Sequence, residues 1–361
     1  MTLWQRLTSF ENLYRAAKEA QLGKRFKRSV AQFNYDLGGR LVELRDELLA
    51  GTYQPGAYRT FTIYEPARRF ISAAPYRDRV VHHALCQVME PLFERSFVFD
   101  SYANRVGKGT HRALDRCTEY CRKYNYVFQG DVRLFFPSID HEILLARLAK
   151  RIWDADLMAL VAMIVRNSNE QPEAHAYFAG DDLFSALWRK RGLPIGNLTS
   201  QFWANVYMDP FDHHFRDELG VPGYIRYVDD FLVFANDKKT LQHWQEEARR
   251  KLAESRLLLN ERKSHIYPVR EGVPFLGFRV FGHDRRLLPN SVKRARRRLA
   301  RLAEEYESGT VELDNVRRSV EAWIAHAKQG NTQGLRRLLL GCVVFRASGR
   351  RSGAGRRVEQ Q

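Results

Sequence analysis

Apolar residues in the first part of the chain recur every three or four positions. One series runs through Val30, Phe33, Leu37, Leu41, Leu44 and Leu48. This spacing places apolar side chains on one face of a helix. Gly51 follows directly, and glycine is favoured just after a helix end. The pattern predicts two helices within residues 2–50, with the basic stretch 24–28 before the second helix.

The middle of the chain mixes strand and helix patterns. The apolar runs at 126–132, 224–228 and 231–235 are short and rich in aromatic and β-branched residues, which is typical of strands. Further strands are predicted at 58–64, 69–71 and 275–281, and helices at 78–93, 114–124, 141–153, 198–216 and 240–255. This interleaved order predicts an α+β core with helical segments at both ends.

The last helical region runs from residue 289 to about 345 and begins with an amphipathic stripe at 291–306. Six basic residues surround the stripe, namely Lys293, Arg294, Arg296, Arg297, Arg298 and Arg301. This arrangement is typical of a solvated helix face or of a surface that binds nucleic-acid phosphates. Residues 346–361 are rich in Gly and Arg and are predicted to form a disordered tail.

Composition narrows the class of partner. The 361 residues include 59 Lys and Arg against 42 Asp and Glu, a formal net charge of +17. This surplus favours a polyanion, because basic groups that meet phosphates release condensed counterions. Ribosomal, membrane-surface and DNA-packaging proteins share the feature. The four cysteines lack zinc-site spacing and the apolar runs are too short for a bilayer, so we expect a cytoplasmic protein without membrane association.

Three aspartates interrupt the apolar runs. Asp229 and Asp230 separate two of them, and Asp131 stands near the end of a third. Considered separately, Asp229 and Asp230 fit a two-residue hairpin tip, and Asp131 fits the end of a strand. Two adjacent carboxylates at a tight turn repel one another, however, and a divalent cation removes that repulsion. Only the fold joins Asp131 to the other two, so we expect its strand to lie beside the hairpin.

Carboxylates grouped in this way suit phosphoryl transfer from a nucleoside triphosphate. Two Mg²⁺ ions are then held by a few carboxylates and by the phosphates of the substrate. One ion lowers the pKa of the attacking hydroxyl group, and the other stabilises charge on the leaving pyrophosphate. Mn²⁺ is an alternative ion in vitro.

These residues belong to a series of segments that resembles the bacterial and phage reverse transcriptases. Tyr227–Asp230, with the sequence Tyr-Val-Asp-Asp, looks like the family's Tyr-x-Asp-Asp box. Six further boxes are matched in family order by segments 69–71 with 77–84, 102–111, 131–141, 192–201, 259–266 and 275–278. The resemblance spans residues 58–281, and seven ordered boxes make chance agreement a poor explanation.

The resemblance implies a right-hand polymerase fold, with fingers and palm built from an antiparallel sheet plus helices, and a helical thumb. The corresponding ranges are an N-terminal helical extension at 1–55, fingers and palm at 56–285, a thumb at 286–345 and a basic tail at 346–361. The implied activity is that of an RNA-directed DNA polymerase. Its implied partners are a template RNA, a primer or cDNA, and dNTPs.

Catalytic roles follow at the matching positions. Asp131, Asp229 and Asp230 would bind the two metal ions, with the Val132 carbonyl as a further ligand. Phe136 would be the sugar gate, whose ring clashes with a ribose 2′-hydroxyl and selects deoxynucleotides. The alternative is an ordinary core phenylalanine, although two adjacent phenylalanines on one strand do not both face the core.

Three further side chains would contact the nucleotide. Arg69 would bind the triphosphate; relatives often have a lysine where this chain has Ala67, and Arg68 is the expected substitute. Gln201 would face the incoming nucleotide, and Lys263 would donate a proton to pyrophosphate. The alternatives are a solvated hairpin arginine, a polar residue at a helix start and a surface lysine. The implied primer–template contacts are Lys293, Arg294, Arg297, Arg298 and Arg301.

The box at 192–201 indicates a subclass. Group II intron and many retron enzymes tend to have Gln-Gly followed by Ser-Pro, whereas this chain has Ile195-Gly196 and Ser200-Gln201. That form resembles the reverse transcriptases of diversity-generating retroelements. Those enzymes copy a template RNA with errors opposite adenine and work with a small, basic, oligomeric accessory variability protein. Retron-like and phage-defence-associated reverse transcriptases share related boxes and are the alternatives.

Two other kinds of function fit parts of the sequence. A catalytically quiet RNA-binding scaffold would share the positive charge, but it has no reason to keep three carboxylates together. An RNA-dependent RNA polymerase shares the palm chemistry, but Phe136 argues against it.

Overall fold

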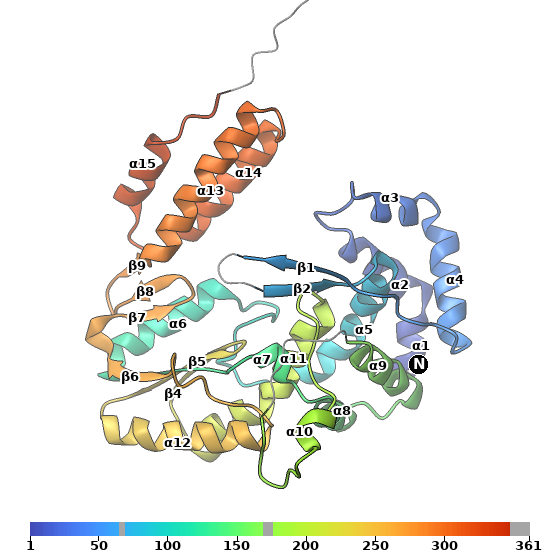
Figure 1. Ribbon diagram of the computed structural model, residues 1–361, viewed down its shortest axis with the longest axis horizontal. Helices are drawn as coiled ribbons and strands as arrows, with labels where there is room; N and C mark the ends of the chain where they lie inside the picture. The colour runs from blue at the N-terminus through green and yellow to red at the C-terminus, as the bar shows by residue number, and fades with distance from the viewer. Residues whose placement is uncertain (65–68, 169–175, 347–361) are drawn as a thin grey trace, which may run out of the picture. The chain divides into compact units, whose positions relative to one another are not determined.

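A computed structural model describes residues 1–64, 69–168 and 176–346 (Figure 1). The chain divides into two compact units. The first comprises Met1–Ala113 and Tyr126–Tyr267, and the second comprises Leu114–Asn125 and Pro268–Gln361. Within the described part of the chain, no helix is both long and apolar enough to cross a membrane. The predicted tail lies outside the described residues from position 347 onward.

The first unit contains a four-stranded sheet next to α12 (Lys238–Glu254) (Figure 1). Its order is β4-β5-β3-β6, with the strands β3 (Tyr126–Asp131), β4 (Gly223–Tyr227), β5 (Asp230–Ala235) and β6 (His265–Pro268). β5 pairs antiparallel with both β3 and β4. Its residues 231–234 are all fully buried, which explains why this strand has an unbroken apolar sequence rather than an alternating one.

Helices complete the core of the first unit. α12 (Lys238–Glu254) packs on β3 and β5, and α11 (Leu198–His213) packs against α5 (Tyr76–Glu94) and α8 (His141–Ala149). The others in this region are α7 (Phe135–Ser138), α9 (Ala155–Arg166), α10 (Ser185–Trp188) and a π-helical turn at His214–Glu218. The predicted helix at 198–216 therefore ends in a π-helical turn.

The N-terminal segment contains four helices rather than the two predicted. They are α1 (Leu3–Thr8), α2 (Phe10–Ala20), α3 (Arg28–Tyr35) and α4 (Leu37–Leu49). The Asp36 carboxylate accepts the Gly39 amide at 3.1 Å and caps α4, so the continuous apolar series is split there. Ser9 separates the first two helices in the same way, because its hydroxyl accepts the Asn12 amide. Helical periodicity alone does not reveal such internal caps.

A separate antiparallel hairpin follows the N-terminal helices. β1 (Arg59–Ile63) pairs with β2 (Arg69–Ala73), and Ile63 lies opposite Arg69. The strand prediction for both segments is confirmed. The residues at the predicted turn between them lie outside the described residues.

The second unit combines a three-stranded sheet with helices. β7 (Val273–Phe275), β8 (Phe278–Val280) and β9 (Arg285–Leu287) pair in that order. α6 (Thr110–Lys123) ends in this unit, and the chain continues after β9 into α13 (Pro289–Glu307), α14 (Leu313–Ala327) and α15 (Gln333–Gly341). The predicted helical character after residue 288 is confirmed.

The segment 275–281 was predicted as one strand, and this is wrong. Leu276 and Gly277 have φ values of 48° and 90°, and they form a tight turn between β7 and β8. Two consecutive positive φ values are typical of the two-residue turns that suit the right-handed twist of a hairpin. The alternating apolar pattern on both sides of the turn hides it in the sequence.

Candidate active site

The sheet brings the three predicted catalytic aspartates together. In the pairing of β3 with β5, Asp131 lies directly opposite Asp230. Asp229 precedes β5, and its carbonyl oxygen accepts the amide of Val132 at 3.1 Å. The expectation that the Asp131 strand lies beside the hairpin is therefore confirmed. Two positions far apart in sequence become neighbours because β5 is flanked by both β3 and β4.

The hairpin tip is displaced by one residue from its predicted position. Tyr227 pairs with Asp230, so the two connecting residues are Val228 and Asp229, not Asp229 and Asp230. Val228 has a φ of 60°. A β-branched residue rarely adopts this left-handed conformation, and such strain persists only where surrounding contacts impose it.

A loop before β6 supplies contacts to Asp131 that the sequence did not assign. The Asn260 side-chain amide donates to the Asp131 carboxylate at 2.7 Å, and Lys263 Nζ lies 3.0 and 3.2 Å from its two oxygens. The Asp131 backbone amide donates to Ser264 Oγ at 3.3 Å. Asn260 and Ser264 lie inside the box at 259–266, and this box was the sequence feature that could have indicated their contacts with Asp131. Lys263, predicted to act at pyrophosphate, lies against the carboxylate itself.

The three carboxylates create an unfavourable concentration of negative charge. Burial first, and then the charges of Asp229 and Asp131, raise the pKa of Asp230 from 3.8 to about 7, against the opposing charge of Lys263. Among the described residues, no group of three or more His, Cys, Asp or Glu side chains is already arranged around one point as a metal centre. The donor set nevertheless fits a hard divalent cation, because carboxylate oxygens are its preferred ligands and its charge relieves this repulsion.

We expect Asp230→Asn to stabilise the metal-free protein at neutral and higher pH. The wild-type carboxyl ionises near pH 3.8 when unfolded and near 7 when folded, so folding takes up a proton between those values. Wild-type stability therefore falls as pH rises from about 4 to about 7, by at most about 4 kcal/mol, and the variant escapes this loss. Thermal melting with a chelator across this range is the measurement. A difference in melting temperature that does not widen with pH would contradict the expectation.

The predicted sugar-gate residue lies in a short helix instead of a strand. Phe135 and Phe136 begin α7, directly after Leu134, which has a φ of 45°. Phe135 is buried, whereas Phe136 is only half-buried, and the two rings meet edge to face. The Phe136 carbonyl accepts the Leu193 amide at 2.9 Å. The left-handed residue after the strand turns the chain into α7, so consecutive side chains diverge by a helical rather than a strand angle.

Gln201 lies in the first turns of α11, as predicted, and is half-buried. The segment before it is fastened to β2. The Ser72 amide donates to the Ile195 carbonyl at 2.9 Å, and the Asn197 side-chain amide donates to the Ser72 carbonyl at 3.3 Å. The box at 192–201 and the strand that begins at Arg69 are thus joined by hydrogen bonds. Arg69 lies in β2, but its side chain and residues 65–68 are outside the described part.

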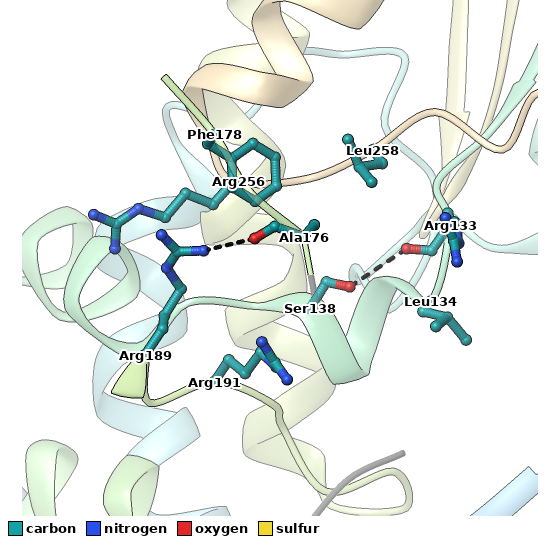
Figure 2. Close-up of a pocket in the computed structure, with 9 residues that line it drawn as sticks. All are labelled: Arg133, Leu134, Ser138, Ala176, Phe178, Arg189, Arg191, Arg256 and Leu258. Atoms are coloured by element: carbon teal, nitrogen blue, oxygen red, sulfur yellow. Dashed lines mark hydrogen bonds between the residues drawn. The ribbon is translucent and has the colours of Figure 1, made fainter. Parts of the chain in front are cut away.

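A basic pocket lies beside α7 in the first unit (Figure 2). It is lined by Arg133, Leu134, Ser138, Ala176, Phe178, Arg189, Arg191, Arg256 and Leu258. Arg189 and Arg256 both approach the buried Asp140 carboxylate, with N···O distances of 3.5 and 2.6 Å. None of the nine lining residues is acidic. Sequence reasoning did not find this pocket, because its arginines come from three separate segments.

In the second unit, α13 carries the predicted nucleic-acid contacts. Ala295, Leu299 and Leu302 form its buried stripe. Four of the five predicted residues are exposed and one, Arg294, is half-buried with a hydrogen bond to Ser291 Oγ at 3.2 Å. The helix therefore presents a basic surface opposite its apolar side.

Comparison with known protein families gives a match over more than half of the chain. The profile described as "Reverse transcriptase (RNA-dependent DNA polymerase)" matches residues 65–280. This range contains the three aspartates, Phe136, Gln201 and Lys263. It ends before α13.

Curated relatives include bacterial proteins and a plant intron maturase. Protein YkfC of Escherichia coli (strain K12) is 28% identical over 288 residues, which are 68% of this chain and 72% of YkfC. The group II intron-encoded protein LtrA of Lactococcus lactis subsp. cremoris is 22% identical over 177 residues, 48% of this chain and 28% of LtrA. Nuclear intron maturase 1, mitochondrial, of Arabidopsis thaliana is 26% identical over 96 residues, 27% of this chain and 14% of the maturase. The chain thus covers only a small part of these intron proteins.

Solved structures include one with a comparable fold. Apo telomerase from Candida tropicalis matches with a TM-score of 0.51 at 11% sequence identity, covering 79% of this chain and 60% of the telomerase chain. At this identity the likeness concerns the fold alone. Together with the observed sheets and helices, it confirms the predicted α+β polymerase fold.

Proposed function

This chain belongs to the reverse transcriptase (RNA-dependent DNA polymerase) family, and we propose that it is an active RNA-directed DNA polymerase that makes cDNA from a template RNA. One observation carries the proposal: Asp131 lies opposite Asp230 at the tip of the β4–β5 hairpin, next to Asp229. A scaffold that only binds RNA gains nothing from this repulsion. Primer extension on an RNA template with Mg²⁺ and dNTPs tests the proposal, and RNA binding without incorporation on any template would reject it.

In this proposal, Asp131, Asp229 and Asp230 would hold two Mg²⁺ ions, with the Val132 carbonyl as a further ligand. When bound, such ions would lower the pKa of the primer 3′-hydroxyl and neutralise charge on the triphosphate. Lys263 exchanges its contact with Asp131 for one with the substrate phosphates, which suits an exposed side chain on a flexible stem. Arg69 and Gln201 bind the nucleotide from the two segments that hydrogen bonds join.

The primer and the template RNA are proposed to contact the basic surface of α13. Exposed arginines and lysines on one helix face suit the regularly spaced phosphates of a duplex. Contacts with phosphates are electrostatic and do not depend on the nucleotide sequence, so the affinity for the duplex should fall steeply as the salt concentration rises. The proposed substrates of the activity are dNTPs. If the chain belongs to the proposed subclass, a basic, oligomeric accessory protein is its further partner.

Phe136→Ala is expected to weaken the selection of deoxynucleotides by about 10- to 100-fold, because an interaction that excludes one hydroxyl group contributes a few kcal/mol. The half-buried ring can face a bound sugar, whereas the buried Phe135 cannot. The ratio of dNTP to rNTP incorporation is the measurement. Phe135→Leu serves as the control and should keep the wild-type ratio. An unchanged ratio in Phe136→Ala would remove this residue as the gate.

For the subclass, we propose the error-prone enzyme of a diversity-generating retroelement, supported by the form of the box at Ile195–Gln201. Sequencing cDNA made from a defined RNA is expected to reveal misincorporation concentrated opposite template adenine. Ile195→Gln changes this box toward the intron form while leaving the Ile195 carbonyl free to accept the Ser72 amide, and it should reduce those errors. Uniformly low errors at all four bases would reject the subclass and leave the polymerase proposal intact.

A second candidate for the subclass is an intron-type reverse transcriptase. It is favoured by the similarity to LtrA and to the Arabidopsis maturase. The two candidates differ in the expected error spectrum, so the same sequencing experiment separates them.

A further inference from the structure

A fully buried arginine lies directly behind the hairpin tip. Arg226 belongs to β4, two residues before Val228, and its side chain is 0% exposed. Its partner is Asp212 of α11, which is also 0% exposed. Two nitrogens of the guanidinium group each donate to a different Asp212 oxygen at 2.6 Å. Burying an arginine is unfavourable unless its charge and all its donors are satisfied, so a specific arrangement must hold it there.

The guanidinium group makes as many hydrogen bonds as it has N–H groups, which is five. Besides the two to Asp212, it donates to Asn205 Oδ1 at 3.2 Å and to Ser101 Oγ at 3.1 Å. The fifth bond, at 3.0 Å, goes to the carbonyl oxygen of Val228. The side chain therefore connects α11 and the segment after α5 to the turn that carries Asp229.

This fifth bond acts on the strained residue of the turn. Val228 has a φ of 60°, a conformation that a β-branched residue adopts only under constraint. Arg226 fixes its carbonyl oxygen from one side, and the Val132 amide fixes the carbonyl oxygen of Asp229. Two consecutive carbonyl groups of the turn are thereby held, which sets the direction in which the adjacent carboxylates project.

The backbone of Arg226 is equally constrained. Its amide donates to the Asp100 carbonyl at 3.0 Å, and its carbonyl accepts the Tyr102 amide at 3.0 Å. The hydroxyl of Tyr224 donates to Asp212 at 2.6 Å and helps to orient that carboxylate. The arginine thus cannot move away from the turn without breaking contacts with three separate segments.

We propose that Arg226 and Asp212 form a buried positioning pair that holds the Val228–Asp229 turn in the conformation needed to bind the catalytic metal ions. The inference rests on the proposed polymerase function. Neither residue touches the substrate, because both are enclosed in the core. Their effect is transmitted through the Val228 carbonyl, which only a planar, forked side chain can reach while it also binds both Asp212 oxygens.

Arg226→Lys separates positioning from charge. Lysine keeps the positive charge near Asp212, but a single ammonium group cannot replace the fork and the bond to the Val228 carbonyl together. Hydrogen exchange of the peptide at 226–232 in the metal-free protein should become at least about 10-fold faster. The affinity for Mn²⁺ in the absence of nucleotide, measured by electron paramagnetic resonance, should fall about 10- to 100-fold, as is usual when a residue that orients metal ligands is changed. The kcat for incorporation should fall similarly, with a smaller change in KM for dNTP.

Arg147→Lys is the matched control. Arg147 of α8 is half-buried, and it donates to the Tyr207 carbonyl of α11 and to Ser255 Oγ. It contacts the same helix as the pair does, but not the turn. Its replacement by lysine should lower the melting temperature without changing Mn²⁺ affinity or exchange at 226–232. If it reproduced the effects of Arg226→Lys, the pair would be merely structural and the proposal would fail.

A milder variant covers the case in which Arg226→Lys does not fold. Tyr224→Phe removes one hydrogen bond to Asp212 and leaves the arginine in place. It should accelerate exchange at the turn and weaken Mn²⁺ binding by about 3-fold, a change that one hydrogen bond of about 0.7 kcal/mol would produce. Wild-type exchange and Mn²⁺ binding in either folded variant would overturn the proposal. If the wild-type protein incorporates no nucleotide, the polymerase proposal fails, while exchange at the turn still decides the role of the pair.

Discussion

Asp229→Ala is expected to reduce the rate of nucleotide incorporation on an RNA template by at least about 1,000-fold, since removal of one preorganised charge-stabilising group costs 10²- to 10³-fold and a lost metal ion adds to this. Asp131→Ala should have an effect of the same size. The two residues reach the site from different strands, Asp131 from β3 and Asp229 from the β4–β5 turn. A similar loss from both positions is therefore difficult to explain by a local disturbance of one strand.

Rates of single-nucleotide addition under saturating dNTP are the measurement, and Asp237→Ala is the control. Asp237 caps α12 by accepting the Thr240 amide at 2.8 Å and lies beyond the far end of β5 from the turn. Its loss should cost about 1 kcal/mol of stability, as for other helix caps, and leave the rate unchanged. Full activity in either Asp229→Ala or Asp131→Ala would rule out the proposed mechanism.

Gly130→Ala is expected to destabilise the first unit by about 3 kcal/mol or to prevent its folding, because overpacking a closed core costs 1–3 kcal/mol and more where nothing can move. Gly130 precedes Asp131 in β3 and pairs with Phe231 of β5. An added Cβ would lie 2.2 Å from the end of the Phe231 ring. That ring is fully buried and packs edge to face on Phe128 and Phe211, so it has no free space.

Urea denaturation of both proteins measures this effect. Gly38→Ala is the matched control, because an added Cβ at this exposed position of α4 meets nothing within 4 Å. Replacing a helical glycine by alanine should raise stability by up to about 1 kcal/mol. The same substitution is therefore expected to lower stability at Gly130 and to raise it at Gly38. Wild-type stability in Gly130→Ala would mean that the β3–β5 packing described above is incorrect.

Local patterns predicted most of the strands and helices and identified three aspartates as candidate catalytic residues. The apolar runs around Asp131 and Asp229–Asp230 predicted the strands, and the ordered boxes predicted the family. These features can be recognised locally, because the apolar pattern of a strand and the residues of one box each lie within a few positions of the sequence. The break at Asp36 and the turn at Leu276–Gly277 were missed because each lies inside a continuous apolar pattern.

Contacts between distant segments were decided by the tertiary structure. The sequence determined by itself that three carboxylates interrupt apolar strands. Only the pairing of β3 with β5 decided that Asp131 faces Asp230, and only the pairing of β4 with β5 placed Val228 in the turn. In the sequence, Arg226 is simply a charge within an apolar strand. The structure supplies Asp212 and the Val228 carbonyl as its partners, because a buried charge is stabilised by whichever groups the fold brings to it.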